Sequence, residues 1–116
     1  MASEMQELAP PPPEEVLRVG NLEIHTMELD VFADGDRVGL TVREFETFMA
    51  LAVRLDRVVR RDDLYRKVWG REMAPHDRSV DVFVKKVRKK LECCAPSWIY
   101  IHTHFGVGYR FSPERR

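Results

Sequence analysis

The segment DRSVDVFVKKVRKKLE, residues 77–92, decides the fold of this chain. At the 100° spacing of an α-helix, its apolar side chains fall on one side and its cations on the other. The apolar side consists of Val80, Val84, Val87 and Leu91, and the opposite side of Arg78, Val82, Lys85, Lys86 and Lys89. With Asp77 as a favourable N-cap, the segment predicts a helix that packs by one face. A solvated surface is the commoner reason for a cationic face, so the helix alone identifies no partner.

The first third of the chain has the pattern of a small antiparallel sheet. Short apolar runs flank Gly20-Asn21 and Asp34-Gly35, and both dipeptides favour the tight turns of β-hairpins. We expect four short strands, with the third at residues 31–33 and the fourth at 38–40.

Two helices are predicted between this sheet and residues 77–92. Thr41 and Glu44 have the spacing of a capping box at the start of the first helix. Apolar residues then recur at helical spacing: Val42, Phe45, Phe48, Met49, Ala52 and Leu55. After a brief extended piece, Asp62 and Asp63 favour the first turn of a shorter helix, which Gly70 ends.

The last residues are predicted to form a β-hairpin. Two apolar runs flank a turn that contains Gly106 and Gly108, with its tip at about residues 103–107. A short helix, a loop, the cationic helix and a hairpin follow one another in the order of a helix-turn-helix with a wing. The predicted fold class is therefore α+β: a winged helix-turn-helix with an N-terminal four-stranded antiparallel sheet, a three-helix bundle and a C-terminal β-hairpin wing. A cationic helix in that setting has the shape to enter the DNA major groove.

Length and charge place further bounds. The 116 residues have room for one domain. We assign residues 1–16, which include four consecutive prolines, to a disordered lead, 17–112 to the folded domain and 113–116 to a tail. The net charge is zero, but residues 1–56 carry −8 and residues 57–116 carry +8. No apolar run reaches the ~20 residues of a membrane span and no secretory signal occurs, so we expect a cytoplasmic protein without a membrane partner.

Five groups of short motifs run along nearly the whole chain. They are Asp34-Gly35; Leu40-Thr41 with Glu44-Phe45; Arg57-Val58-Val59 with Leu64 and Val68-Trp69-Gly70; Arg78-Ser79-Val80-Asp81-Val82 with Arg88-Lys89-Lys90-Leu91; and Gly106-Val107-Gly108-Tyr109-Arg110-Phe111. Each is weak alone. Together they resemble the C-terminal effector domain of OmpR/PhoB-type bacterial response regulators, from Leu17 to Phe111.

The resemblance implies sequence-specific binding of double-stranded DNA, with residues 77–92 as the recognition helix. By the family pattern, the DNA contacts would come from Arg78, Ser79, Val82, Lys85, Lys86 and Lys89, and in the wing from Thr103, His104 and Phe105. The loop at 71–76, with Arg71, Glu72 and His76, would be the segment that contacts RNA polymerase. The resemblance also implies paired domains on repeated half-sites, a receiver domain upstream that these residues do not contain, and no cofactor.

Two features depart from the family pattern. Relatives commonly carry Arg where this chain has Phe105, so reading of the minor groove by Arg is not expected here. The Phe105 ring has two alternatives, a contact with DNA sugars or a base step, or folding back on its own hairpin, and we expect the second. Lys85 and Lys86 stand where relatives often have Arg. Lysine does not make the bidentate contact of Arg with guanine, so either the base choice would differ from that of relatives or binding would rest more on phosphate attraction.

Two other classes of function remain as alternatives. A zinc enzyme would use His102, His104, Cys93 and Cys94, because histidines two apart on a strand share a face and thiolates bind zinc. Adjacent cysteines lack chelating spacing, and no phosphate loop or nucleophile motif occurs, so we expect reduced thiols, no metal and no enzyme.

The second alternative is a winged-helix module that binds another protein through its acidic sheet, without specific DNA binding. The cationic helix face argues against it, as do the basic residues after the wing tip, Arg110, Arg115 and Arg116.

Overall fold

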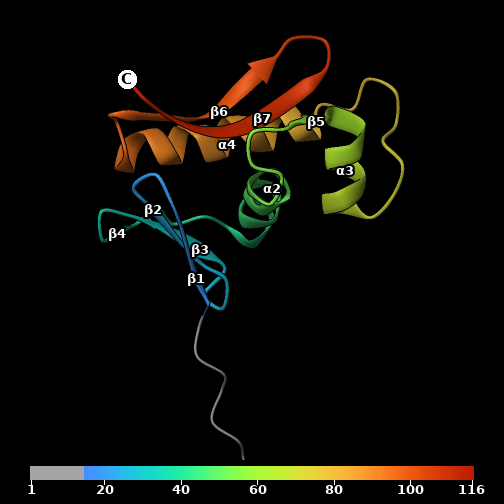
Figure 1. Cartoon of the computed structure of the whole chain (residues 1–116). Coiled ribbons are helices and arrows are strands. Elements are labelled where there is room, and N and C mark those ends of the chain that lie inside the picture. The colour runs from blue at the N-terminus through green and yellow to red at the C-terminus, as the bar shows by residue number, and fades with distance from the viewer. Residues whose placement is uncertain (1–14) are drawn as a thin grey trace, which may run out of the picture.

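The computed structural model describes residues 15–116, which form two β-sheets with three helices between them (Figure 1). The elements in chain order are β1 (Val16–Val19), β2 (Leu22–His25), β3 (Asp30–Ala33), β4 (Asp36–Arg37), α2 (Val42–Ala52), β5 (Val58–Arg60), α3 (Arg61–Trp69), α4 (Ser79–Cys94), β6 (Trp98–His104) and β7 (Gly108–Arg115). The first sheet has the order β1-β2-β3-β4 and the second β5-β7-β6, both antiparallel. In Figure 1 the β1–β4 sheet lies below α2 and the tip of the β6–β7 hairpin above it, while the β1–β2 turn contacts β6, where Tyr100 accepts a hydrogen bond from the Asn21 N–H (3.0 Å). The predicted fold class is confirmed.

The β3–β4 hairpin turns at the dipeptide that the sequence marks. Asp34 and Gly35 both have positive φ, 51° and 88°, as a two-residue turn with the twist of a hairpin requires. Asp is one of the few residues other than Gly that tolerates this backbone region.

β4 is shorter than predicted, and the fourth strand expected at residues 38–40 is wrong. Ladder pairing with β3 reaches only from Asp36 to Arg37, the partner of Phe32. The carboxylate of Asp30 accepts hydrogen bonds from the backbone N–H of Leu40 (3.0 Å) and from the guanidinium of Arg37 (3.0 Å). These bonds draw the chain out of the sheet towards α2.

The first helix begins with the predicted capping box. Thr41 Oγ1 accepts from the Glu44 N–H (3.2 Å), and the Glu44 carboxylate accepts from the Thr41 N–H (2.8 Å). The predicted apolar face is wrong at both ends. Glu44 itself turns inward and is 3% exposed, which places Val42 in solvent at 58% exposure, and Leu55 lies beyond the helix end at Ala52.

The core is formed where α2, α4 and the second sheet meet. The rings of Phe48 and Phe111, both buried, make an edge-to-face contact with centroids 5.2 Å apart. The apolar side of α4 is buried along its length, as predicted, through Val80, Val84, Val87 and Leu91. Each fully buried side chain of this size contributes about 1.5–3 kcal/mol. α4 is thus fixed in rotation about its own axis.

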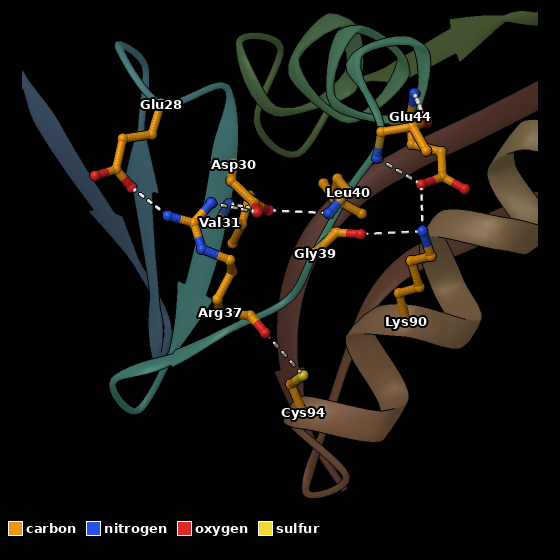
Figure 2. A network of polar contacts seen from close by, with 10 residues as sticks. Glu28, Asp30, Val31, Arg37, Gly39, Leu40, Glu44, Lys90 and Cys94 are labelled. Atoms are coloured by element: carbon orange, nitrogen blue, oxygen red, sulfur yellow. Dashed lines mark hydrogen bonds and ion pairs between the residues drawn. The ribbon is translucent and has the colours of Figure 1, made fainter.

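A polar network joins the C-terminal half of α4 to the chain around β3 and β4 (Figure 2). Lys90 Nζ donates to Glu44 Oε1 (2.6 Å) and to the carbonyl of Gly39 (3.0 Å). Burial raises the pKa of Glu44, but the hydrogen bonds from Lys90 and Thr41 outweigh it and hold that pKa below its ordinary value. The buried carboxylate is therefore ionised and paired.

Several predicted boundaries move by a few residues. α4 begins at Ser79 and not at Asp77, although the Asp77 carboxylate does accept a hydrogen bond from the Ser79 N–H (2.8 Å). β7 continues to Arg115, so residues 113–115 belong to a strand and not to a tail. Of the predicted lead, residues 1–14 lie outside the described part, and Val16 begins β1. Within residues 15–116, none of the helices has the length and apolarity needed to cross a bilayer.

We expect Lys90→Met to lower the free energy of unfolding by about 1–3 kcal/mol at neutral pH, because the buried Glu44 carboxylate loses its cation. Since the pKa of Glu44 is depressed in the folded protein, the pair stabilises above the ordinary value of 4.5 and this contribution is lost as the pH falls through the folded pKa. The stabilities of wild type and variant should therefore converge in acid. Denaturant unfolding across pH measures this, with the exposed Lys89→Met as control. Equal stability of wild type and Lys90→Met at neutral pH would contradict the account.

Candidate nucleic-acid interface

The side of α4 that points away from the core is a row of exposed side chains. Val82 is 45% exposed, and Lys85, Lys86 and Lys89 are exposed as well. The burial of the opposite side, described above, leaves these residues as the free face. The division of the helix into a packed and a cationic side is confirmed.

Other cations on or beside α4 are held by groups within the protein. Arg78, at the N-cap, lies 3.5 Å from the Asp81 carboxylate. Arg88 donates to the hydroxyl of Thr103 in the wing (3.0 Å), and Lys90 is taken up by the network around Glu44. Arg88 and Lys90 connect α4 to its neighbours, whereas the Arg78 side chain remains 74% exposed.

The three remaining lysines, Lys85, Lys86 and Lys89, are here called the lysine row. None of them forms an ion pair with another residue in the described range, and Lys86 Nζ lies 4.9 Å from the ring centroid of Phe83. Three uncompensated positive charges on one helix face form a surface that attracts a polyanion.

An acidic residue in the first turn of α4 is neutralised from two other elements. The carboxylate of Asp81 accepts two hydrogen bonds from Arg61 at the start of α3 (3.1 and 2.6 Å) and one from the Tyr109 hydroxyl of β7 (2.5 Å). Sequence reasoning missed this cluster. The signal that was present is an acid at position 81 in the middle of a cationic segment, since such an acid needs a partner.

The Asp81 cluster shifts the pKa of both acids that it contains. Burial, together with the hydrogen bond to Asp81, raises the pKa of Tyr109 from 10.0 to about 12. Burial alone would raise the pKa of Asp81, but the bonds from Tyr109 and Arg61 outweigh it and lower that pKa. The cluster therefore stays an ionised carboxylate with a neutral phenol, and the negative charge of Asp81 is covered.

The wing tip, residues 103–107, is held by backbone contacts. The Val107 N–H donates to the His104 carbonyl (3.0 Å), and the Val107 carbonyl accepts from the N–H of Arg61 (3.2 Å). Gly106 has a φ of +76°, a conformation that glycine adopts without strain. The turn is thereby attached to the start of α3.

Phe105 lies at this tip with 92% of its surface exposed. The expectation that the ring folds back on its own hairpin is wrong. His104 beside it accepts a hydrogen bond from Arg110 (3.1 Å).

The start of α4 and the wing tip line one shared hollow. Its walls are formed by Arg61, Arg78, Asp81, Thr103, His104, Phe105, Gly106, Gly108 and Tyr109. Of the expected wing contacts, Thr103, His104 and Phe105 all belong to it. Of the predicted helix residues, Arg78 lines it, so the hollow joins the start of α4 to the predicted wing residues.

The loop between α3 and α4 presents the residues expected to contact a polymerase. Arg71, Glu72 and His76 are all exposed. The Arg71 guanidinium lies 5.8 Å from the ring centroid of Tyr65, and Glu72 pairs with Arg66 at 3.2 Å. These contacts attach the start of the loop to α3.

The residues of the alternative zinc site do not come together. Cys93 and Cys94 end α4, whereas His104 lies at the far end of β6. His102 Nε2 contacts the carbonyl oxygen of Ser112 (2.9 Å). Among residues 15–116, no three His, Cys, Asp or Glu side chains are placed to hold a metal ion.

The chain matches the family model described as "Transcriptional regulatory protein, C terminal" over residues 35–111. It is 35% identical over 101 residues to the DNA-binding response regulator MtrA of Mycolicibacterium smegmatis, covering 87% of this chain and 44% of that protein. It is 39% identical over 101 residues to the transcriptional regulatory protein ResD of Bacillus subtilis, covering 86% and 42%. The chain therefore spans less than half the length of these relatives.

Solved structures agree with the fold. The DNA-binding domain of Klebsiella pneumoniae RstA, in complex with the RstA box, superposes with a TM-score of 0.77 at 31% identity, covering 86% of this chain and 99% of that chain. The DNA-binding domain of CpxR from E. coli gives a TM-score of 0.75 at 28% identity, covering 84% and 96%.

The Asp81 cluster can be tested through its phenol. We expect Asp81→Asn to lower the pKa of Tyr109 from about 12, because the hydrogen bond to the carboxylate is lost. The pKa should stay above 10.0, since the burial of the phenol remains. We also expect the unfolding free energy to fall by about 1–3 kcal/mol, since Arg61 loses a charged partner. Ultraviolet titration of the phenols measures the pKa, with Tyr109→Phe identifying the group and Asp62→Asn, an exposed acid of α3, as control. An unchanged titration curve in Asp81→Asn would refute the cluster.

Proposed function

This chain belongs to the family of C-terminal domains of transcriptional regulatory proteins, of OmpR/PhoB type, and we propose that it binds double-stranded DNA sequence-specifically as the output domain of a bacterial transcription regulator. The recognition helix α4 enters the major groove, and the wing tip lies near the adjacent minor groove. The observation that carries the proposal is the lysine row, which stays uncompensated while Arg88 and Lys90 are held by groups within the protein. Bacterial DNA lies in the cytoplasm, and the domain acts there.

The roles of the α4 residues follow from their exposure. Lys86 and Lys85 reach base edges or phosphates from the middle of the helix, and Lys89 reaches a phosphate nearer its end. Val82 lies among the cations with its side chain exposed, where it can contact a thymine methyl. Arg78 and Ser79 at the start of the helix approach the phosphate backbone.

Relatives support this assignment by their own activities. RstA of Klebsiella pneumoniae has been solved on its DNA box, and MtrA is named as a DNA-binding response regulator. A second solved relative, the AdeR DNA-binding domain, was determined with an intercistronic DNA region at a TM-score of 0.70 and 27% identity.

Further partners extend the proposal. Because relatives are more than twice as long as the matched stretch, we infer a receiver domain upstream of this domain in the regulator. The exposed loop residues Arg71, Glu72 and His76 contact RNA polymerase, and two domains pair on repeated half-sites.

The proposal is tested by selecting binding sites for the purified chain from random duplex DNA at two salt concentrations. We expect enrichment of a repeated half-site and an affinity that falls steeply as salt rises. If no sequence is enriched and retention does not depend on salt, the winged-helix protein-interaction module becomes the better reading.

On the selected site, Lys86→Ala and Lys89→Ala should behave differently. We expect Lys86→Ala to lower specific affinity by about 10–100-fold with a smaller effect on random DNA, since it removes a base contact. Lys89→Ala should weaken binding to every sequence and reduce the slope of log affinity against log salt by about 1, because one phosphate contact is lost. Fluorescence anisotropy across a salt series measures both. Arg18→Ala on β1, outside α4 and the wing tip, removes the same charge and should leave binding unchanged. Equal losses on all sequences from both lysine variants would rule out base reading by Lys86.

A further inference from the structure

Phe105 differs from every other Phe, Tyr and Trp side chain in residues 15–116. The others are buried or half-buried, and most are in ring contacts with one another, whereas Phe105 is 92% exposed and contacts no other ring. A single exposed apolar side chain is ordinary on a protein surface. A function for Phe105 therefore has to be argued from the place of the residue in the fold.

The turn that carries Phe105 is anchored on both sides. The Val107 carbonyl is bonded to the N–H of Arg61, and Gly108 packs so closely on β5 that an added Cβ would lie 1.9 Å from the Val59 carbonyl oxygen. Across the hairpin, Arg88 of α4 holds Thr103. The backbone that carries the ring therefore keeps its position relative to α4, and only the side-chain rotamers of Phe105 are fixed when it enters a binding site.

The surroundings of Phe105 point to a polyanion with an apolar interior. Phe105 lines the hollow that also contains Arg61, Arg78 and Asp81, beside the first turn of α4, and the two guanidinium groups share that one carboxylate. The tip itself, residues 103–107, carries neither Lys nor Arg, and the next cation, Arg110, donates to His104. The tip therefore presents an apolar group on a cationic side of the molecule, which fits the minor groove of DNA, where phosphates lie outside and base edges inside.

We propose that Phe105 inserts from the minor groove between two stacked base pairs next to the site read by α4, and kinks the DNA there. The proposal rests on the proposed function and adds to it a residue that determines sequence preference through DNA shape. Burial of the ring offsets the cost of unstacking a base step. Because the gain and the cost are of similar size, the balance depends on the step, and flexible TA or CA/TG steps are preferred over stiff A-tracts.

The test uses the selected duplex with a single half-site, in two versions that place either a TA step or an A-tract where the wing tip lies. We expect Phe105→Ala to weaken binding about tenfold on the TA version and less than about twofold on the A-tract version. 2-Aminopurine at the TA step should brighten when the wild type binds, because the base loses its stacking partner, and should stay dim with Phe105→Ala. End-to-end energy transfer across the duplex should report bending only with the wild type.

Two matched variants complete the design. Phe105→Leu keeps an apolar wedge and should retain part of the 2-aminopurine response. Val53→Ala removes exposed apolar surface at the end of α2, outside α4 and the wing tip, and should bind like the wild type. The melting temperature of Phe105→Ala is the control for folding. Because Phe105 is exposed, we expect it to equal that of the wild type.

The outcomes separate this inference from the function it rests on. If the wild type binds without a 2-aminopurine response, insertion of Phe105 is overturned and DNA binding stays intact. If Phe105→Ala loses equal affinity on both duplexes, insertion is also overturned, and the ring contacts sugars instead. A loss that occurs only on duplexes with two half-sites overturns it in favour of a contact with a second copy of the chain. A wild type that binds neither duplex overturns both proposals.

Discussion

The burial of one side of α4 is the constraint on which the candidate site depends. The side chains of a helix are fixed at 100° intervals, so sealing Val80, Val84, Val87 and Leu91 into the core also decides which residues point outward. Rotating α4 by a single position would bury Lys85 or Lys86 and expose a valine, and the cost of burying an unpaired charge forbids this. The same packing that stabilises the fold therefore presents the lysine row.

Polar contacts at both ends of α4 complete this arrangement. Near its start, Asp81 is bonded to α3 and to β7 through Arg61 and Tyr109. In its last turns, Lys90 is bonded to the Glu44 carboxylate and to the loop before α2 (Figure 2). Apolar packing resists rotation of the helix, and these directional bonds resist its sliding along its axis. Internal pairing of the other cations also leaves the lysines as the positive charge that an external anion meets.

Much of this was predictable because it depends on local chemistry. The spacing of residues 77–92, the capping box at Thr41 and the Asp34-Gly35 turn each depend on neighbours in sequence, and all three are as expected. The misses involve partners distant in sequence. Glu44 is buried because it pairs with Lys90, which is 46 residues away in the sequence. β4 ends early because the carboxylate of Asp30 binds the N–H of Leu40. Periodicity does not contain such contacts.

In the proposed complex, the outer face of α4 and the wing tip contact the same DNA duplex. The most direct measurement is a titration of isotope-labelled protein with the selected duplex, followed by amide NMR. We expect the largest changes in amide chemical shift in α4 around the lysine row and in residues 103–107, with the β1–β4 sheet unchanged. Shifts centred on the β1–β4 sheet, with the α4 face unaffected, would contradict the proposed complex.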